Sequence, residues 1–330
     1  MRKLLLNSTA IATVAALTAS VAVADVSISA STEFKYKTRG SLVAANDTTT
    51  NTTDSEIVFK FSNKTDSGLT IGYVAELTAG GTGTDGTFDE SSLSIAGGFG
   101  KVVLGENDGV GDNFGIAAVD LIAEENLDSV KSARVSTNSD IVQGAGDNTK
   151  IAYFMPAMGN LTAGVSSYEA GSAAGDTTTF GAAYAMDVDG IDVTIGGAST
   201  STPVANAKNT QSHNVGIKVA TMGGDLKMTL SRGSYAAVDE NRDANGFAAS
   251  YKLTSDITVG AYTVNSKDAK DAGEKYEASG VEAQYTIAAG LTAVVSVGNY
   301  DYQVGTNADT DMSAVSDNGT STSVTIKASF

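Results

Sequence analysis

Carboxylates gather in one long segment of this sequence. Residues 107–147 hold eight of them, and six are candidates for a functional role: Asp108, Asp112, Asp120, Glu124, Glu125 and Asp128. Apolar residues with a partly helical spacing run between them, namely Ile116, Val119, Ile122, Leu127 and Val130. Loops longer than about 15 residues in a compact domain usually carry function or are disordered. The segment therefore indicates a concentrated negative charge on a loop that its apolar residues hold against a neighbouring surface.

A second charged group lies near the start of the chain and alternates in sequence. Its members all fall on the polar side of a period of two, and they are Glu33, Lys35, Lys37, Arg39, Lys60, Lys64 and Glu76. Alternation places such residues on one face of extended strands. We expect this face to carry mainly cations, with Lys35 and Lys60 near the middle of their strands.

The residues that enzymes most often need are scarce. His213 is the only histidine and there is no cysteine, so neither a histidine-based metal site nor a Ser-His-Asp triad can be assembled. The pattern at 81–86 fits G-x-G-x-x-G, but no helix is expected after it, as a dinucleotide site requires. Asp187-Val188-Asp189-Gly190 lacks the spacing of a calcium-binding EF-hand and is typical of a tight turn. We predict no enzyme.

The composition and the first residues restrict the class further. Arg2 and Lys3 precede an apolar run, and Ala22-Val23-Ala24 closes it with the small-residue pattern of a secretory signal cleaved after Ala24. The formal charge of −17 opposes nucleic-acid binding. No later stretch is long and apolar enough for a membrane-spanning helix. We expect residues 1–24 to be a signal peptide and residues 25–330 to form a single domain.

The mature sequence alternates between apolar and polar residues almost throughout. Sixteen such runs predict strands, near 25–38, 55–65, 68–79, 88–97, 101–107, 148–155, 161–169, 176–187, 190–200, 211–221, 225–234, 243–253, 256–266, 276–287, 290–301 and 320–330. Most are long enough to cross a bilayer when tilted. Short turns at one end alternate with longer polar loops at the other, which is typical of an up-and-down barrel.

The polar face of these strands favours a membrane barrel over a soluble one. A soluble barrel fills its interior with apolar side chains, whereas the polar sets here are Ser, Thr, Gly, Lys and Glu. The sequence therefore predicts an all-β protein, a transmembrane antiparallel β-barrel of 16 strands with a water-filled lumen. Aromatic belts at the two membrane interfaces would be formed by Tyr36, Phe61, Tyr73, Tyr153, Tyr184, Tyr251, Tyr285, Tyr300 and Phe330.

Three parts of the chain stand out: residues 64–69 (KTDSGL), residues 95–105 (IAGGFGKVVLG) and the terminal Phe330. With them the sequence resembles the general diffusion porins of Gram-negative bacteria, especially those of alphaproteobacteria. It implies an outer-membrane homotrimer whose third loop, residues 107–147, folds inward and narrows the pore. The family also places basic residues of the first two strands at this constriction, which Lys35 and Lys60 match. Adventitious calcium on the acidic loop is a further implication, and no other cofactor is expected.

These expectations combine into a function and leave alternatives open. We expect passive diffusion of small polar solutes and ions through the outer membrane, with a weak preference for cations because the chain is acidic. The carboxylates of loop 107–147 could instead lie on a solvated outer loop. A sugar- or phosphate-selective channel is the alternative within the membrane class. A secreted β-rich adhesin or surface-layer protein is the alternative outside it.

Overall fold

The computed structural model describes residues 25–43, 47–80, 87–123, 148–169, 175–238, 240–270, 273–305 and 316–330. The expected signal peptide, residues 1–24, lies outside them. In the described part of the chain, sixteen antiparallel strands close into one barrel, in which each strand pairs with its sequence neighbours and β16 pairs with β1. In chain order the elements are β1 (Asp25–Ser41), β2 (Thr48–Lys64), β3 (Thr70–Gly80), β4 (Thr87–Gly97), β5 (Gly100–Glu106), α1 (Gly109–Phe114), η2 (Ala118–Leu121), β6 (Thr149–Phe154), β7 (Leu161–Glu169), β8 (Asp176–Val188), β9 (Ile191–Thr202), β10 (Thr210–Thr221), η3 (Met222–Gly224), β11 (Leu226–Ala236), β12 (Asn241–Lys252), β13 (Ile257–Asp268), β14 (Lys275–Ala288), β15 (Leu291–Gln303) and β16 (Asp317–Ser329).

The sixteen strands expected from the sequence are confirmed, with one substantial change of boundary. Residues 39–54, between the first two expected strands, are largely strand, because β2 begins at Thr48 and pairs with β1 up to Arg39. Residues 48–54 carry no apolar alternation, yet they are rich in threonine, a β-branched residue that favours extended backbone. The ladder therefore continues beyond the apolar part of these two strands.

The short connections lie where the sequence places them. Asp189 and Gly190 alone join β8 to β9, with φ angles of 53° and 81°. Two consecutive residues with positive φ give the hairpin turn whose twist matches paired strands, and Asp and Gly tolerate that conformation best. Comparable short turns join β2 to β3, β4 to β5, β6 to β7, β10 to β11, β12 to β13 and β14 to β15. All of them lie at one end of the barrel.

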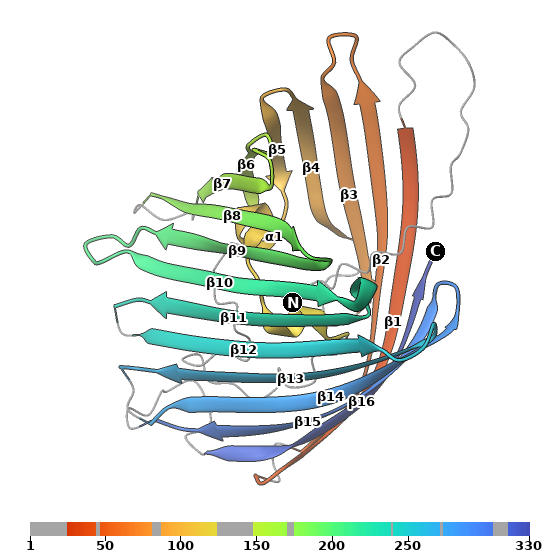
Figure 1. Cartoon of the computed structure of the whole chain (residues 1–330). Coiled ribbons are helices and arrows are strands. Elements are labelled where there is room, and N and C mark those ends of the chain that lie inside the picture. The colour runs from red at the N-terminus through yellow and green to blue at the C-terminus, as the bar shows by residue number, and fades with distance from the viewer. Residues whose placement is uncertain are drawn as a thin grey trace.

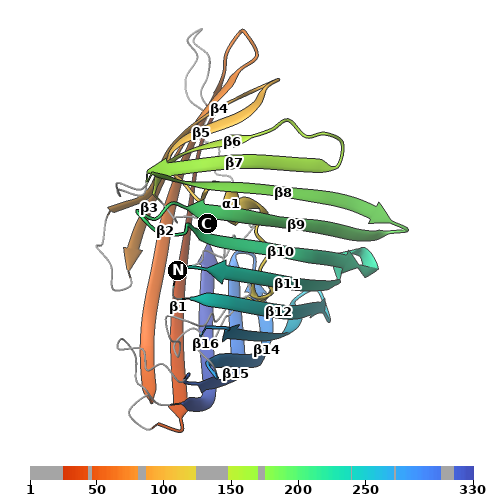
Figure 2. The ribbon, with the colours of Figure 1, turned by 90° about the vertical axis from the view of Figure 1, so that its left-hand side faces the viewer.

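The two faces of the barrel wall differ in chemistry, as alternation predicts. Large apolar residues point outward and stay exposed, for example Ile28, Phe34, Phe180 and Val281. The inward face carries small polar residues, including the fully buried Ser296, Ser321, Ser323 and Thr325. Figure 1 shows the strands as a tilted ring around α1, and Figure 2 shows the same ring after a quarter turn. This is the arrangement of a barrel with an apolar exterior and a polar interior.

The prediction for one aromatic residue is wrong. Tyr300, expected in an outer aromatic belt, pairs with Ala278 and Gly319 on the inward face and is 4% exposed. Its hydroxyl donates a hydrogen bond to Asp317 Oδ2 at 3.2 Å. The parity of β15 explains the error, because Val295 and Val297 point outward and Tyr300 differs from both by an odd number of residues. Among the helices of the described residues, none has the length and apolarity to span a membrane.

Candidate functional site: a loop on the inner wall

The segment after β5 turns into the barrel and follows its inner wall. Its first helix, α1, packs against β6, β7, β8 and β9, and η2 packs against β11, β12 and β13. In both views α1 lies inside the ring of strands (Figure 1, Figure 2). The inward course expected for the third loop is therefore confirmed over residues 107–123. Residues 124–147 lie outside the described part of the chain.

Apolar side chains of this loop are buried against the wall. Val110 and Ile122 are fully buried, and Phe114, Ile116 and Val119 are at most 8% exposed. Of the apolar residues expected to hold the loop, Ile116, Val119 and Ile122 are thus buried, whereas Leu127 and Val130 lie outside the described residues. Burial of this apolar area stabilises the loop in place.

Glycines on the inward face of the strands make room for these side chains. A Cβ atom built on Gly181 would lie 2.8 Å from Phe114 Cβ and 2.9 Å from Val110 Cγ1. A Cβ on Gly216 would lie 2.6 Å from Ile116 Cβ, and one on Gly260 would lie 2.9 Å from Ile122 Cδ1. Real Cβ contacts are not this short. Gly164 and Gly196 also lie against the loop, because Cβ atoms built on them would lie 3.1 Å from Val110 Cγ2 and 3.2 Å from Ile116 Cδ1, closer than most real contacts. The loop therefore fits a groove whose floor is glycine, and we call these five residues the glycine floor.

Side chains of the wall also hold the backbone of the loop. Asn214 on β10 binds both polar groups of one residue, because its Oδ1 accepts from Ile116 N at 2.7 Å and its Nδ2 donates to Ile116 O at 2.9 Å. Ser166 accepts from Val110 N at 3.2 Å, and Ser231 accepts from Ala118 N at 2.8 Å. These bonds satisfy buried backbone groups that would otherwise destabilise the inward course.

A second two-sided contact fixes the last described residue of the loop. Glu282 on β14 accepts from Ala123 N at 2.9 Å, and Lys327 on β16 donates to Ala123 O at 2.8 Å. Lys327 also lies 2.9 Å from Glu33, which in turn lies 3.1 Å from Lys35. The loop is thereby connected to the charged face of β1.

The acidic residues of the described loop lie mostly away from the wall. Asp112 and Asp120 are exposed, although their neighbours Gly111 and Val119 are buried, and Asp108 is half-buried at the start of α1. Asp120 Oδ2 accepts from Ala117 N at 3.2 Å. Glu124, Glu125 and Asp128 lie outside the described residues. The loop is thus amphipathic, with apolar side chains against the wall and carboxylates on its other side.

The expected wall residues all lie on the inward face, but they lie at different heights along the strands. Register pairs Glu33 with Lys327, Lys35 with Thr325 and Lys60 with Ser27, all on inward positions. From Ser27 to Lys35 the ladder advances eight residues, about 26 Å along the strand. Lys35 and Lys60 therefore cannot line the same narrow section. Lys35 is adjacent to the loop through Glu33, whereas Lys60 lies toward the end with the short turns.

The other wall residues extend the charged face in both directions. Lys37 and Arg39 continue inward on β1 toward the outer end, where Arg39 is buried. Lys64 is exposed next to the turn that follows β2. Glu76 on β3 is buried and pairs across the ladder with Glu90. The inner wall of β1 to β3 therefore carries both signs of charge over its whole length.

Several residues that hold the loop were not expected from charge and spacing, above all Asn214, Ser231 and Glu282. Their parity places them inward, but parity does not reveal which inward residue meets the loop. The glycine floor was the available signal, because glycine within a strand often marks close approach by another part of the chain. The described residues contain no group of three or more His, Asp or Glu arranged for a metal. Calcium on the loop stays a prediction, since Glu124, Glu125 and Asp128 lie outside them.

A closed barrel with an apolar exterior, a polar interior and a loop folded along the inner wall is a membrane channel of the β-barrel class. The chain belongs to the family described as Gram-negative porin, whose family model matches residues 10–329. It is therefore an outer-membrane channel protein, and the alternative of a secreted adhesin or surface-layer protein is not supported. Cleavage of a signal after Ala24 stays a prediction.

Solved structures agree with this assignment. The anion-selective porin from Comamonas acidovorans has a TM-score of 0.67 at 15% identity, covering 93% of this chain and all of its own. Salmonella typhi OmpF in complex with daunomycin has a TM-score of 0.67 at 13% identity, with 93% and 98% covered. The trimer form of Vibrio cholerae OmpT has a TM-score of 0.64 at 12% identity, with 93% and 99% covered. Identities this low establish a shared fold alone. Among curated proteins, none matches the chain in sequence.

Proposed function

We propose that the chain forms a passive diffusion pore for small hydrophilic solutes and ions, narrowed by loop 107–147 and weakly selective for cations. One observation carries the proposal: the helices of the described loop pack on the inner wall between β6 and β13 with their apolar side, whereas Asp112 and Asp120 are exposed. The passage then lies between these carboxylates and the inner faces of β1 to β5. This assigns the constriction role to the acidic loop and to the charged face of β1.

The charges on the two sides of this passage differ in sign. α1 packs on β8 and β9, which are half a turn of the sixteen-strand barrel away from β1. Asp112 on α1 therefore lies across the lumen from the side that carries Lys35, Lys37 and Arg39. Opposed charges across a narrow aqueous gap orient water and disfavour apolar solutes, and rings of side-chain charge set ion preference.

The cation preference is expected to be weak because the wall itself is mixed. Glu33 is paired with both Lys35 and Lys327, which cancels part of the positive charge beside the loop. The loop carboxylates and the acidic chain as a whole then tip the balance toward cations. The similar Comamonas porin is described as anion-selective, but at 15% identity its wall charges do not transfer to this chain.

Reversal potentials in a potassium chloride gradient test this proposal. Wild type is expected to prefer potassium slightly, and Asp112→Asn with Asp120→Asn is expected to move the reversal potential toward the chloride side. The control is Asp66→Asn, which removes a carboxylate from the turn between β2 and β3. Anion preference in wild type would refute the selectivity, and equal potentials for all three proteins would refute the role of the loop.

A sugar-selective channel is disfavoured by the burial of the inward tyrosines. Tyr262, Tyr276, Tyr300 and Tyr302 all face inward, but each is at most 4% exposed because they pack together with the loop in one apolar cluster. Rings buried in this way cannot stack on a passing sugar. We expect swelling rates of proteoliposomes to fall smoothly with sugar size and to show no saturation with maltose, whereas saturation would favour the selective channel.

We also propose that the channel assembles as a homotrimer. The fold is that of porins, and one similar solved structure, Vibrio cholerae OmpT, is described in a trimer form. Native mass spectrometry of detergent-solubilised protein tests this proposal, and a uniformly monomeric species would contradict it.

A further inference from the structure

An apolar groove crosses the outside of the barrel on β7 to β9. Its floor is formed by Ala163, Ala182 and Gly197, which are directly opposite one another across these strands. Bulkier side chains stand two positions away in both directions, about 6.6 Å along the strand, as Phe180 and Tyr184 do on β8. The volume of the groove is about 630 Å³, within the range of pockets that hold small ligands. Its lining also includes Tyr153, Met155, Val165, Ser199 and His213.

The backbone of the sheet separates this groove from the loop inside the barrel, without a side chain between them. Gly164 and Gly181 line the groove from the outside. On the inside, a Cβ atom built on Gly181 would lie 2.8 Å from Phe114 Cβ, so α1 contacts the same backbone. Asn214 lines the groove as well, and its side chain holds the backbone of Ile116. A molecule in the groove and the docked loop therefore contact opposite faces of one peptide layer.

The groove lies within the apolar belt of the barrel. The outward positions of β8 are apolar or aromatic from Phe180 to Val188, whereas Asp176 and Thr178 follow toward the longer loops. This belt faces hydrocarbon chains in a transmembrane barrel, and the groove continues the same surface. Its polar end, where Ser199 Oγ lies 2.9 Å from His213 Nδ1, is on the side of the longer loops. The groove thus has the depth and the polarity of the outer lipid leaflet.

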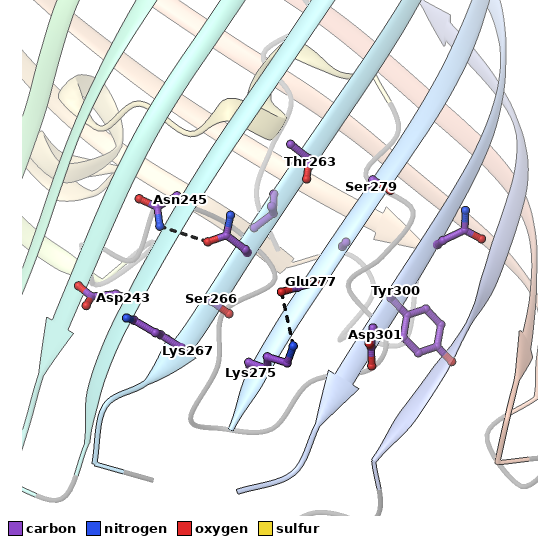
Figure 3. A pocket seen from close by; sticks show the side chains of 14 residues that line it. Asp243, Asn245, Thr263, Ser266, Lys267, Lys275, Glu277, Ser279, Tyr300 and Asp301 are labelled. Atoms are coloured by element: carbon purple, nitrogen blue, oxygen red, sulfur yellow. Dashed lines mark hydrogen bonds and ion pairs between the residues drawn. The ribbon is translucent and has the colours of Figure 1, made fainter. Parts of the chain in front are cut away.

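The distribution of outward charge separates the groove from the face on which copies of the chain are expected to meet. Protein interfaces are depleted of charged residues at their centre. Among the residues that the structure describes, the outward positions of β16 and β1 to β3 carry no charged side chain. Glu169 and Asp176 stand on outward positions beside the groove. Figure 3 shows Lys267, Lys275 and Glu277 on the outward face of β13 and β14. Contacts between copies are therefore expected on the neutral side, which leaves the groove to lipid.

We propose that the groove binds an unbranched acyl chain of an outer-leaflet lipid, and that this chain supports the wall on which the loop is docked. The inference rests on the proposed membrane pore. A chain lying over Ala182 contacts the backbone of Gly181 from the outside, while Val110 and Phe114 contact it from the inside. The sheet is then packed on both faces and resists bowing outward, so α1 stays in place. By linkage, docking of the loop strengthens binding of the chain by the same factor.

Quenching of a single tryptophan measures occupancy of the groove, because the chain has no tryptophan of its own. Phe180→Trp places the reporter in the groove, and Phe247→Trp places it on the apolar belt of β12. A phospholipid brominated on an unbranched acyl chain is titrated into each protein in detergent. Half-maximal quenching of Phe180→Trp is expected at a roughly fivefold lower ratio of lipid to detergent than that of Phe247→Trp. The reason is that about ten additional, individually weak atom contacts hold a chain in the groove.

Filling the groove tests whether it is the binding site. Ala182→Leu, added to the Phe180→Trp protein, occupies the floor and is expected to move the quenching curve to that of Phe247→Trp. Ala249→Leu adds the same side chain to the apolar belt of β12 and is expected to leave the curve unchanged. Both leucine variants are expected to keep heat-modifiable gel mobility, because neither changes the backbone pairing of its strand.

Open-channel noise in planar bilayers measures the support that the chain gives to the loop. Methyl-branched acyl chains are too wide for a groove with a single row of small residues as its floor. Wild type is therefore expected to be noisier in bilayers of a methyl-branched phospholipid than in bilayers of an unbranched one. Ala182→Leu is expected to show no difference between the two lipids, whereas Ala249→Leu keeps the difference that wild type shows.

Three results would overturn the proposal. One is half-maximal quenching of Phe180→Trp and Phe247→Trp at the same ratio of lipid to detergent. Another is equal noise of wild type in the two lipids, which would show that an occupant of the groove does not act on the loop. The third is dissociation of the oligomer by Ala182→Leu, which would assign the groove to contacts between copies. Quenching in detergent does not depend on conduction, so failure of the groove is distinguishable from failure of the proposed pore.

Discussion

Replacing Gly216 by alanine adds one methyl group at the point where the loop meets the wall. That Cβ would lie 2.6 Å from Ile116 Cβ and 3.0 Å from Leu230 O, the second of which is backbone of the neighbouring strand. Carbon atoms in contact lie about 3.5 Å apart, so Ile116 must withdraw by about 1 Å. A side-chain rotation gives little relief, because Ile116 Cβ is attached directly to the backbone.

Withdrawal of Ile116 also breaks the contacts of its backbone. The two hydrogen bonds to Asn214 are now 2.7 and 2.9 Å long, and a shift of about 1 Å takes both beyond hydrogen-bonding distance. Overpacking costs about 1–3 kcal/mol and each lost hydrogen bond about 1 kcal/mol, so docking of the loop weakens by roughly 3–5 kcal/mol. The barrel ladders are unaffected, because Gly216 keeps its backbone pairing.

Single-channel recording in planar bilayers measures the consequence. We expect Gly216→Ala to have larger conductance and more open-channel noise than wild type, with unchanged heat-modifiable gel mobility. Gly40→Ala is the matched control, since a Cβ on Gly40 has no atom within 4 Å. Conductance and noise of Gly216→Ala equal to those of Gly40→Ala and wild type would show that the glycine floor does not position the constriction.

Three other substitutions act on the same loop. Asn214→Leu removes both hydrogen bonds to Ile116, so docking of the loop is expected to weaken by about 2–4 kcal/mol. We expect this loss to appear as more open-channel noise and as a lower melting temperature in calorimetry. Lys327→Met releases Ala123 O and leaves Glu33 with a single cation, so we expect stronger cation selectivity in reversal-potential measurements together with increased noise. Asp120→Lys reverses one exposed charge of the loop, and we expect the reversal potential to move toward chloride. Unchanged values in any of these measurements would contradict the corresponding contact.

The fold could be predicted from the sequence because a barrel of this class repeats one rule. Each strand alternates between lipid and lumen, and each second connection is short, so every strand contributes the same signal. The rule fails where alternation stops, as at residues 48–54, which extend β2 through threonine-rich backbone with no apolar face. It also fails when parity is not applied strictly, as for Tyr300.

The site was predictable in kind but not in detail. Carboxylates on an unusually long segment indicated loop 107–147, and the apolar spacing of Ile116, Val119 and Ile122 indicated that it lies against a wall. Height along the strands was not accessible, because register between β1 and β2 depends on pairing that no single sequence shows. Alternation placed both Lys35 and Lys60 on the inward face and so suggested a common constriction. In the structure their positions along the strands differ by about 26 Å.

The position of the loop depends largely on glycine residues, which have no side chain. Glycine weakens a strand because it adds backbone entropy to the unfolded chain and packs nothing, yet Gly164, Gly181, Gly196, Gly216 and Gly260 all face the lumen of β-strands. A closed barrel tolerates them because each keeps its backbone pairing on both sides. At the same positions a methyl group would lie too close to Val110, Phe114, Ile116 or Ile122 for an ordinary contact. The wall thus specifies where the loop lies through the absence of Cβ atoms, while Asn214, Glu282 and Lys327 specify its height through the backbone of Ile116 and Ala123. Charge alone therefore identifies the carboxylates of the loop, but not the surface that positions them.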